Sequence, residues 1–192
     1  MSKGRLEAFS DGVLAIIITI MVLELAPPHE PNLSALTPLI PKFLSYVLSF
    51  IFIAIYWNNH HHLWQAVEKV NGSILWANIH LLFWLSLVPF VTGWMGENPF
   101  TALPVALYGV VMWMSGLAYY IMVRALTAHH DRGSLLAAAL GNKTKEYISL
   151  SLYTISIPLA FLFPWVSLVL FVIVAIIWLI PDRRIEDLLK DK

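Results

Sequence analysis

The chain has 192 residues, of which 59% are hydrophobic and 12% are charged, and its formal net charge at pH 7 is zero. A soluble domain carries about 25% charged residues, so we interpret this chain as a polytopic membrane protein rather than a soluble core, with the lipid bilayer as its surroundings. Neutral charge gives no support for a nucleic-acid partner. The lack of cysteine excludes disulfides, thiolate metal sites and cysteine nucleophiles.

Apolar blocks of membrane-spanning length, about 20 residues each, predict an all-α fold made of a single six-helix transmembrane domain over residues 1–192. The expected helices cover about 9–25, 43–63, 74–94, 103–124, 146–163 and 165–181. Pro27 and Pro28 end the first helix, because proline cannot continue the backbone hydrogen bonds, and Pro89 predicts a kink in the third. Gly109 and Gly116 lie two turns apart on one face of the fourth helix, where a neighbouring helix could approach closely.

The positively charged residues predict the orientation in the membrane. With six spans, eleven of the twelve Lys and Arg residues lie on the side of both termini, and only Lys42 lies on the other side. We therefore expect a multi-pass protein of the cell inner membrane or plasma membrane, with cytoplasmic N and C termini. The first apolar run has Asp11 near its start and no small-residue cleavage site, so we expect a retained helix rather than a signal peptide.

A stripe of residues on the first helix is a candidate functional surface. Gly12, Ile16, Thr19 and Leu23 share one face at 3.6 residues per turn, with Ile20 at its edge. Most such stripes are packing seams against a neighbouring helix. The alternative is a pore lining, in which apolar rings constrict the path and a threonine ring coordinates ions.

Charged and polar residues before this stripe need partners of their own. Arg5 and Asp11 lie about 240° apart around a helix, so each must contact another helix or water, unless Arg5 is an ordinary cytoplasmic flank and Asp11 a helix-end charge favoured by the dipole. The polar end of the second helix lies at the same membrane face and is the expected partner. Its candidate side chains are Trp57, Asn58, His61 and His62.

The run His60-His61-His62 does not predict a metal site. Adjacent residues on a helix point about 100° apart, so neighbouring histidines cannot close on one ion. No acidic or cysteine co-ligand stands three or four residues away. Catalytic motifs such as G-x-S-x-G, H-E-x-x-H and the phosphate loop are also absent, so we expect neither an enzyme nor a bound cofactor.

The start of the first helix resembles a known family. Arg5-x-x-x-Phe9-Ser10-Asp11 is similar to the R-x-x-x-F-S-D signature of the transmembrane protein 175 potassium channels, and the run from Gly12 to Thr19 fits its continuation. The segment from Tyr56 to His62 also resembles the family's second helix. One signature and one set of six spans resemble the single-repeat bacterial form.

The resemblance implies a homotetramer whose central pore is lined by the first helix of four subunits. The family's hydrophobic constriction would fall at Ile16, with further pore positions at Thr19 or Ile20 and at Leu23. The family favours potassium over sodium without a T-V-G-Y-G carbonyl filter, and this chain also lacks that sequence. Permeant potassium ions would thus be the only small-molecule partners. The motif residues Arg5, Ser10 and Asp11 would not face ions but would bond to the second helix and hold the first in place.

Two other functions remain open from the residues. A secondary transporter or proton-permeable carrier would use Asp11 and the histidines of the second helix. A carrier usually shows repeats and broken helices near mid-membrane, whereas these ionisable groups are predicted at one end. The third possibility is a structural or assembly protein of the membrane.

Overall fold

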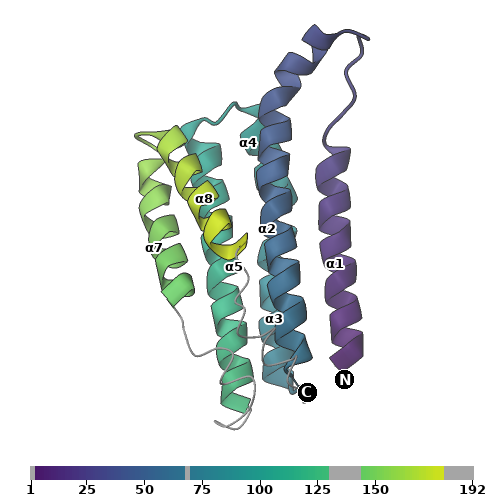
Figure 1. Ribbon diagram of the computed structural model, residues 1–192, viewed down its shortest axis with the longest axis vertical. Helices are drawn as coiled ribbons and strands as arrows, with labels where there is room; N and C mark the ends of the chain where they lie inside the picture. Colours follow the sequence, from purple (N-terminus) through teal and green to yellow (C-terminus); the bar gives the residue numbers. More distant parts are fainter. Residues whose placement is uncertain (1–2, 68–69, 130–143, 180–192) are drawn as a thin grey trace.

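The computed structural model describes residues 3–67, 70–129 and 144–179, and every regular element within them is helical (Figure 1). The elements in chain order are α1 (Lys3–Leu23), the 3₁₀ helix η1 (Leu33–Leu39), α2 (Ile40–Gln65), α3 (Gly72–Ser86), α4 (Val88–Glu97), α5 (Ala102–His129), α7 (Thr144–Leu159) and α8 (Pro164–Leu179).

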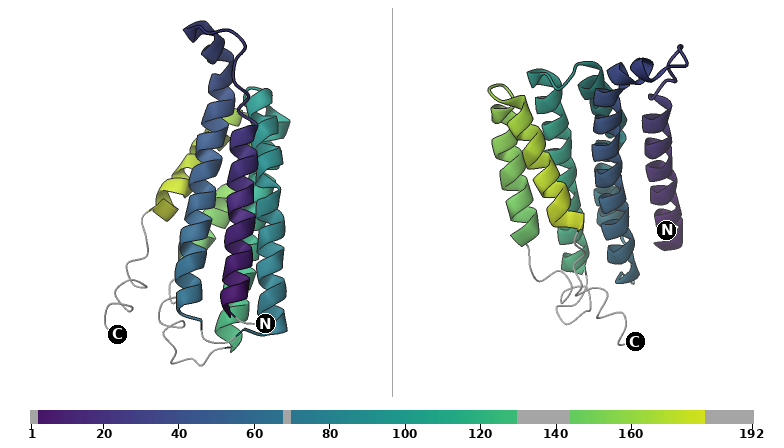
Figure 2. Two further views of the ribbon diagram at one scale, coloured as in Figure 1. Left: turned by 90° about the vertical axis from the view of Figure 1, so that its right-hand side faces the viewer. Right: turned by 45° about the horizontal axis from the view of Figure 1, so that its top comes forward.

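Helix α1 stands at one edge of the bundle beside α2, and α7 and α8 form a hairpin at the opposite edge (Figures 1 and 2). Helices α3 and α5 pack together, and α5 also packs on α7. The start of α1 and the end of α2 lie at one end of the bundle, which the predicted topology makes the cytoplasmic end (Figure 1). We refer to the opposite end, where η1 lies, as the outer end.

Four helical runs are long and apolar enough to cross a membrane: α1, η1 with α2, α3 with α4, and α5. Helices α7 and α8 have 16 residues each. With α3 and α4 counted as one interrupted span, the described residues form the six predicted helical units. The protein is therefore a multi-pass membrane protein.

Several predicted helix limits were wrong. Helix α1 begins at Lys3, not near residue 9, because the polar first turns continue the helix and bury Leu6 against the bundle. Helix α2 extends beyond the predicted 43–63 at both ends. Helix α7 ends at Leu159, directly after Pro158, rather than at residue 163. The predicted limits were those of the apolar runs in the sequence. A helix can begin before such a run or end within it, so the two limits differ. The predicted end of the last helix at residue 181 lies outside the described residues.

The regular helix is interrupted at Leu87, two residues before Pro89, where a kink was expected. Leu87 separates α3 from α4, and Pro89 occupies the first turn of α4. Proline has no N–H to donate to the carbonyl four residues earlier, and its ring collides with that carbonyl. The regular backbone hydrogen bonding of the third span is thus interrupted at this point.

Small residues and hydroxyl groups connect the helices. A Cβ atom on Gly109 would lie 3.0 Å from a ring carbon of Phe171 and 3.1 Å from Ile157, so α7 and α8 approach α5 closely, as the glycine spacing predicted. In the buried centre, Ser49 Oγ lies 2.6 Å from Thr92 Oγ1 and donates to Tyr108 Oη at 3.2 Å. These contacts link α2, α4 and α5.

At the outer end, α2 and α4 come together at an ion pair. Lys42 Nζ lies 3.0 Å from Glu97 Oε1. A Cβ atom on the neighbouring Gly96 would lie only 2.7 Å from Lys42 Cα. Glycine is required here because the two backbones leave no room for a side chain.

Replacing Gly96 by alanine is expected to destabilise the protein by about 1–3 kcal/mol, the usual cost of overpacking, because α2 or α4 must shift. The measurement is the thermal unfolding midpoint of the purified protein in detergent. Gly4→Ala is the control, since no described atom lies within 4 Å of a Cβ built there. Equal midpoints for the two variants would contradict the close contact.

Candidate functional site on helix α1

Helix α1 has one buried face and one exposed face. The buried side chains are Leu6, Ser10, Leu14, Ile17 and Met21, spaced three or four residues apart. They pack on α2, α3 and α4. Because α1 is at the edge of the bundle (Figure 2), its other face meets no described part of the same chain.

The predicted pore residues lie on the exposed face. Ile16 is 59% exposed, Ile20 43% and Leu23 74%. Thr19 is also exposed, and a Cβ atom on Gly12 would meet open space. Within the described chain, this stripe is therefore not a packing seam. It is open to lipid, water or a second subunit.

The hydroxyl of Thr19 retains acceptor capacity on this face. Its Oγ1 donates to the carbonyl oxygen of Ala15, one turn earlier, at 2.8 Å. A hydroxyl has one proton and two lone pairs, so this bond uses the proton and leaves the oxygen able to accept or to coordinate a cation.

Ser10 lies on the opposite, buried face and connects three helices. It is fully buried, and its Oγ donates to the Leu6 carbonyl oxygen at 2.9 Å. The same oxygen accepts a hydrogen bond from Asn78 Nδ2 of α3 at 3.0 Å. Asn78 Oδ1 in turn lies 2.8 Å from Nε2 of His60 on α2. We call Ser10, Asn78 and His60 the buried triad.

The indole of Trp64 also reaches His60. Its Nε1 lies 2.7 Å from His60 Nε2, and the two rings meet edge to face. A protonated Nε2 donates to Asn78, whereas an unprotonated Nε2 accepts from Trp64. The tautomer of His60 thus decides which of the two neighbours it bonds.

Asp11 meets α2 nearer the surface. Trp57 Nε1 donates to Asp11 Oδ1 at 3.0 Å, and both residues are exposed. The Trp57 ring stacks on His61, with centroids 5.8 Å apart and planes 15° from parallel. His61 Nε2 lies 2.8 Å from Gln65 Nε2. Asp11, Trp57 and His61 are therefore joined in one row across α1 and α2.

Other predicted motif residues are not brought to this row. Arg5 and Phe9 lie on the exposed face of α1, and Phe9 is 55% exposed. In the described part of the chain, the side chains of Arg5 and Asn58 form no hydrogen bond or ion pair, and His62 Nδ1 is buried without one. The expected bonding of Arg5 to the second helix is not found, because Arg5 shares the outward stripe of Phe9, Gly12 and Ile16.

Sequence reasoning missed the two residues that hold Ser10. Asn78 is a lone amide in the apolar run of the third span, and polar groups at membrane depth are costly unless paired. That cost was a usable signal for Asn78. His60 was considered only as one of three adjacent histidines, although its spacing of four from Trp64 places the two on the same helix face.

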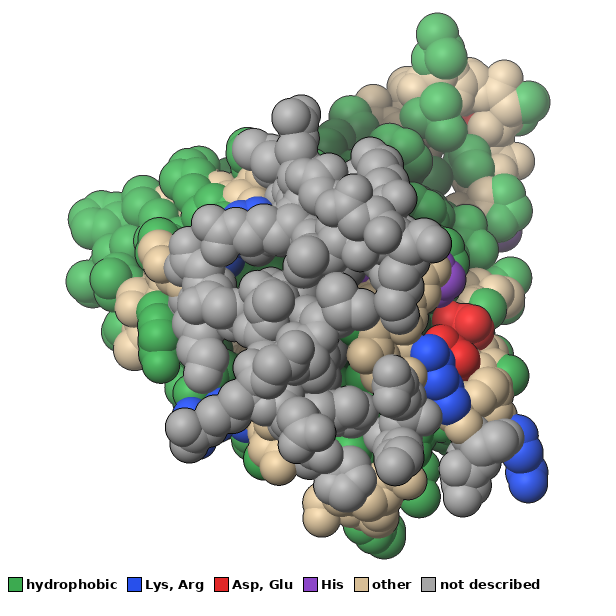
Figure 3. Space-filling model, turned by 60° about the horizontal axis from the view of Figure 1, so that its bottom comes forward, with side chains coloured by type: hydrophobic (Ala, Val, Ile, Leu, Met, Phe, Trp, Pro, Cys, Tyr) green, Lys and Arg blue, Asp and Glu red, His purple; other side chains and the backbone are tan. Residues whose placement is uncertain are grey.

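The end of the bundle at which α1 starts carries a polar hollow. Figure 3 shows acidic side chains next to a basic one and a histidine on this face. The hollow is lined by Gly4, Glu7, Ala8, Asp11, His60, His61 and Trp64. Among the described residues, no three His, Asp or Glu side chains are arranged to hold a metal ion.

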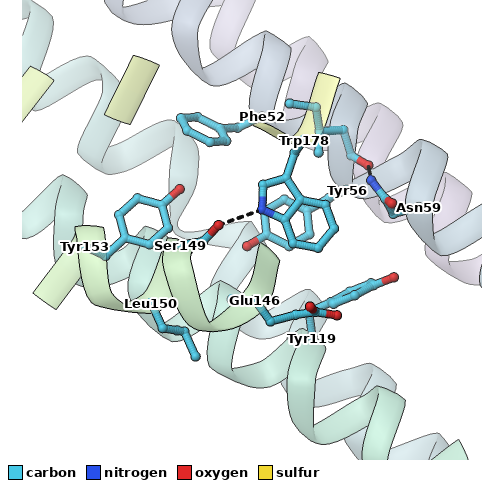
Figure 4. A pocket seen from close by; sticks show the side chains of 11 residues that line it. Phe52, Tyr56, Asn59, Tyr119, Glu146, Ser149, Leu150, Tyr153 and Trp178 are labelled. Atoms are coloured by element: carbon cyan, nitrogen blue, oxygen red, sulfur yellow. Dashed lines mark hydrogen bonds between the residues drawn. The ribbon is translucent and has the colours of Figure 1, made fainter. Parts of the chain in front are cut away.

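A separate cavity lies between α2, α5, α7 and α8, away from α1. Aromatic rings dominate its lining, and Trp178 Nε1 donates to Ser149 Oγ at 2.8 Å (Figure 4). The cavity has a volume of about 40 Å³, which is enough to hold a few water molecules. Since no residue of α1 lines it, this cavity does not belong to the candidate site.

The fold and the site define a multi-pass helical membrane protein whose first helix is bonded on one face and open on the other. A sequence profile described as the endosomal/lysosomal potassium channel TMEM175 matches residues 5–89. A protein of Chryseobacterium sp. (strain P1-3), named a potassium channel, is 54% identical over 191 residues, covering 100% of both chains. The chain belongs to the TMEM175 family.

A second relative and a solved structure agree with this assignment. A protein of Chamaesiphon minutus, also named a potassium channel, is 31% identical over 85% of this chain and 87% of its own. The crystal structure of a lysosomal potassium-selective channel TMEM175 homologue from the same organism has a TM-score of 0.80 and 27% identity. It covers 94% of this chain and 97% of that chain. The similarity therefore extends well beyond the motif segment.

Asn78→Leu is expected to destabilise the protein by about 1–3 kcal/mol, the cost of leaving buried partners unsatisfied, because Ser10 and His60 lose the group between them. The unfolding midpoint in detergent measures this effect. Asn59→Leu is the control, since Asn59 Nδ2 donates only to the Ile55 carbonyl of its own helix, at 2.8 Å. A loss at Asn59 as large as at Asn78 would argue against a special role for the triad.

Proposed function

We propose that this protein is a potassium-selective ion channel, a homotetramer in which α1 of each subunit lines a central pore. The observation that carries the proposal is the exposed stripe of Gly12, Ile16, Thr19, Ile20 and Leu23, directly opposite the buried Ser10 face. Membership of the TMEM175 family and relatives named potassium channels support it. The membrane-spanning runs support a place in the cell inner or plasma membrane, and the distribution of Lys and Arg supports cytoplasmic termini.

Ile16 is proposed as the gate. Its side chain projects from the open face near the middle of α1. Four such side chains around an axis would form an apolar ring that excludes water, and a hydrated ion cannot cross a dewetted constriction. Opening requires the four α1 helices to move apart at Ile16 so that water enters the ring.

Side chains, not backbone carbonyls, would provide the selectivity. Helix α1 is continuous from Lys3 to Leu23, so the carbonyls along the stripe accept hydrogen bonds within the helix. The Thr19 oxygen is the polar side-chain atom between Ile16 and Leu23 on this face. Four of these oxygens would replace part of the hydration shell of a potassium ion.

The motif residues are proposed to hold α1 rather than to meet ions. Ser10 bonds inward to Asn78, and Asp11 accepts from Trp57 at the cytoplasmic end. These contacts fix the rotation of α1, because turning the helix would withdraw Ser10 from Asn78. The rotation in turn determines that Ile16 and Thr19 point away from the bundle.

Ile16→Asn is expected to raise potassium flux into proteoliposomes, because an amide ring is wetted where an isoleucine ring is dry. Ile155→Asn on α7 is the matched control, since Ile155 is 56% exposed and Ile16 59%. The control should leave the flux at the wild-type level. If both variants raise it equally, the increase reflects a general leak and the gate is not at Ile16.

Thr19→Ala is expected to reduce the preference for potassium over sodium, because the ring loses its coordinating oxygens. The reversal potential in planar bilayers with potassium on one side and sodium on the other measures the ratio. Thr19→Ser keeps the hydroxyl and should keep the ratio near that of the wild type. An unchanged ratio in the alanine variant would remove Thr19 from the selectivity mechanism.

The carrier alternative would use Asp11 and the histidines of α2, of which His60 and His61 line the polar hollow together with Asp11. Single-channel recording separates the two functions, since a channel gives discrete current steps and a carrier gives none. Repeating the recording under a proton gradient with sodium and potassium balanced tests whether protons carry current.

A further inference from the structure

A carboxylate stands at the outer end of α1. Glu24 directly follows Leu23, which is the last residue of α1 and of the exposed stripe, and Glu24 is itself exposed. It lines a narrow groove together with Lys42 of α2 and with Gly93 and Glu97 of α4. The side chain of Glu24 is thus directed toward α4 of its own subunit, next to the outer end of the proposed pore lining.

Gly93 makes room for this carboxylate. A Cβ atom on Gly93 would lie 2.5 Å from Glu24 Oε2 and 3.4 Å from Glu24 Cδ. Non-bonded heavy atoms pack at about 3.5–4.0 Å, so a larger residue at position 93 would displace either the carboxylate or α4. The missing side chain on α4 therefore determines where the charge of Glu24 lies.

The charge of Glu24 has no direct partner in the part of the chain that the structure describes, where its carboxylate forms no hydrogen bond or ion pair. Lys42 is paired with Glu97 at 3.0 Å. The groove holds two carboxylates and one ammonium group, which leaves one negative charge at pH 7. A carboxylate just after the C-terminal end of a helix is also unfavourable, because the helix dipole is negative there. Sequences break such local rules mainly at functional positions.

We propose that Glu24 of each subunit supplies the negative charge that concentrates potassium ions at the outer mouth of the channel. The inference rests on the proposed tetramer, in which Leu23 faces the pore and four Glu24 carboxylates surround its outer opening. Charges of one sign around an opening raise the local concentration of counter-ions and their rate of entry. Glu24 acts on the entering ion through water, since its carboxylate lies against Gly93. Such a field attracts potassium and sodium alike, so discrimination between them stays with Thr19.

Glu24→Gln keeps the size of the side chain and removes its charge. The single-channel potassium current carried from the outer side is expected to fall several-fold in about 0.01 M salt and to match the wild type in about 1 M salt, because the Debye length is about 30 Å and about 3 Å, respectively. The potassium-to-sodium permeability ratio should stay unchanged. Glu24→Asp keeps the charge and should keep most of the current.

Glu30→Gln is the matched control. It removes the same charge from the loop that rises beyond the end of α1 (Figure 1), where Glu30 Oε2 accepts from Asn32 Nδ2 at 2.9 Å. Its low-salt current should fall less than that of Glu24→Gln. An equal fall in both variants would assign the field to the whole outer surface and overturn the particular role of Glu24.

A second measurement tests the position of the charge without recording current. Gly93→Ala is expected to lower the unfolding midpoint in detergent, because the added methyl group collides with the carboxylate. Gly93→Ala/Glu24→Asp should recover part of the loss, since aspartate is shorter by one methylene group. A midpoint for Gly93→Ala equal to that of the wild type would overturn the placement of Glu24 against α4.

Failure of this inference differs from failure of the proposed function. A working wild-type channel whose low-salt current is unchanged in Glu24→Gln overturns the role of Glu24 and leaves the channel standing. A loss of current that persists in about 1 M salt is structural rather than electrostatic, and it overturns that role as well. A wild-type protein that carries no potassium current overturns the proposed function itself, and the role of Glu24 with it.

Discussion

The architecture depends on the buried triad, in which Ser10 of α1 accepts a hydrogen bond from Asn78 of α3, and Asn78 lies beside His60 of α2. In an apolar interior, a lone amide is costly, and Asn78 is compensated only while Ser10 and His60 are in place. Packing of Leu14, Ile17 and Met21 would tolerate small rotations of α1, but a hydrogen bond would not. The set therefore gives α1 a single orientation about its own axis, and through it a definite outward face.

That orientation explains why the charged motif and the proposed ion path are separate. Asp11 and Ser10 lie close to the start of α1, yet their partners belong to α2 and α3 of the same subunit. The residues left facing outward are small, branched or hydroxylated. One face of α1 packs within the subunit, and the other face is exposed. In the proposed tetramer, the exposed faces of the four α1 helices would surround the pore.

Much of this arrangement could be predicted from the sequence. Helix number, membrane location and the family follow from apolar length and from a signature of fixed spacing, because both are local properties of the chain. The contact of Trp57 with Asp11 lay within the predicted pairing of the two helices. Asn78 was not predicted, since its contact with Ser10 spans 68 positions and depends on how α3 is placed beside α1. Arg5 is exposed within the single described chain, so its predicted bond to the second helix stays a prediction.

The break at Leu87 divides the support of α1 into two levels. Below it, α3 carries Asn78. Above it, α4 carries Thr92 and Gly93, which line a groove with Met21 of α1 and with Glu24, the residue after the end of α1. An interrupted helix bends more easily at the interruption, because hydrogen bonds are missing there. The two ends of α1 therefore rest on supports that need not move together. Tilting of α4 alone would then displace Leu23 and leave the contact of Ser10 with Asn78 in place.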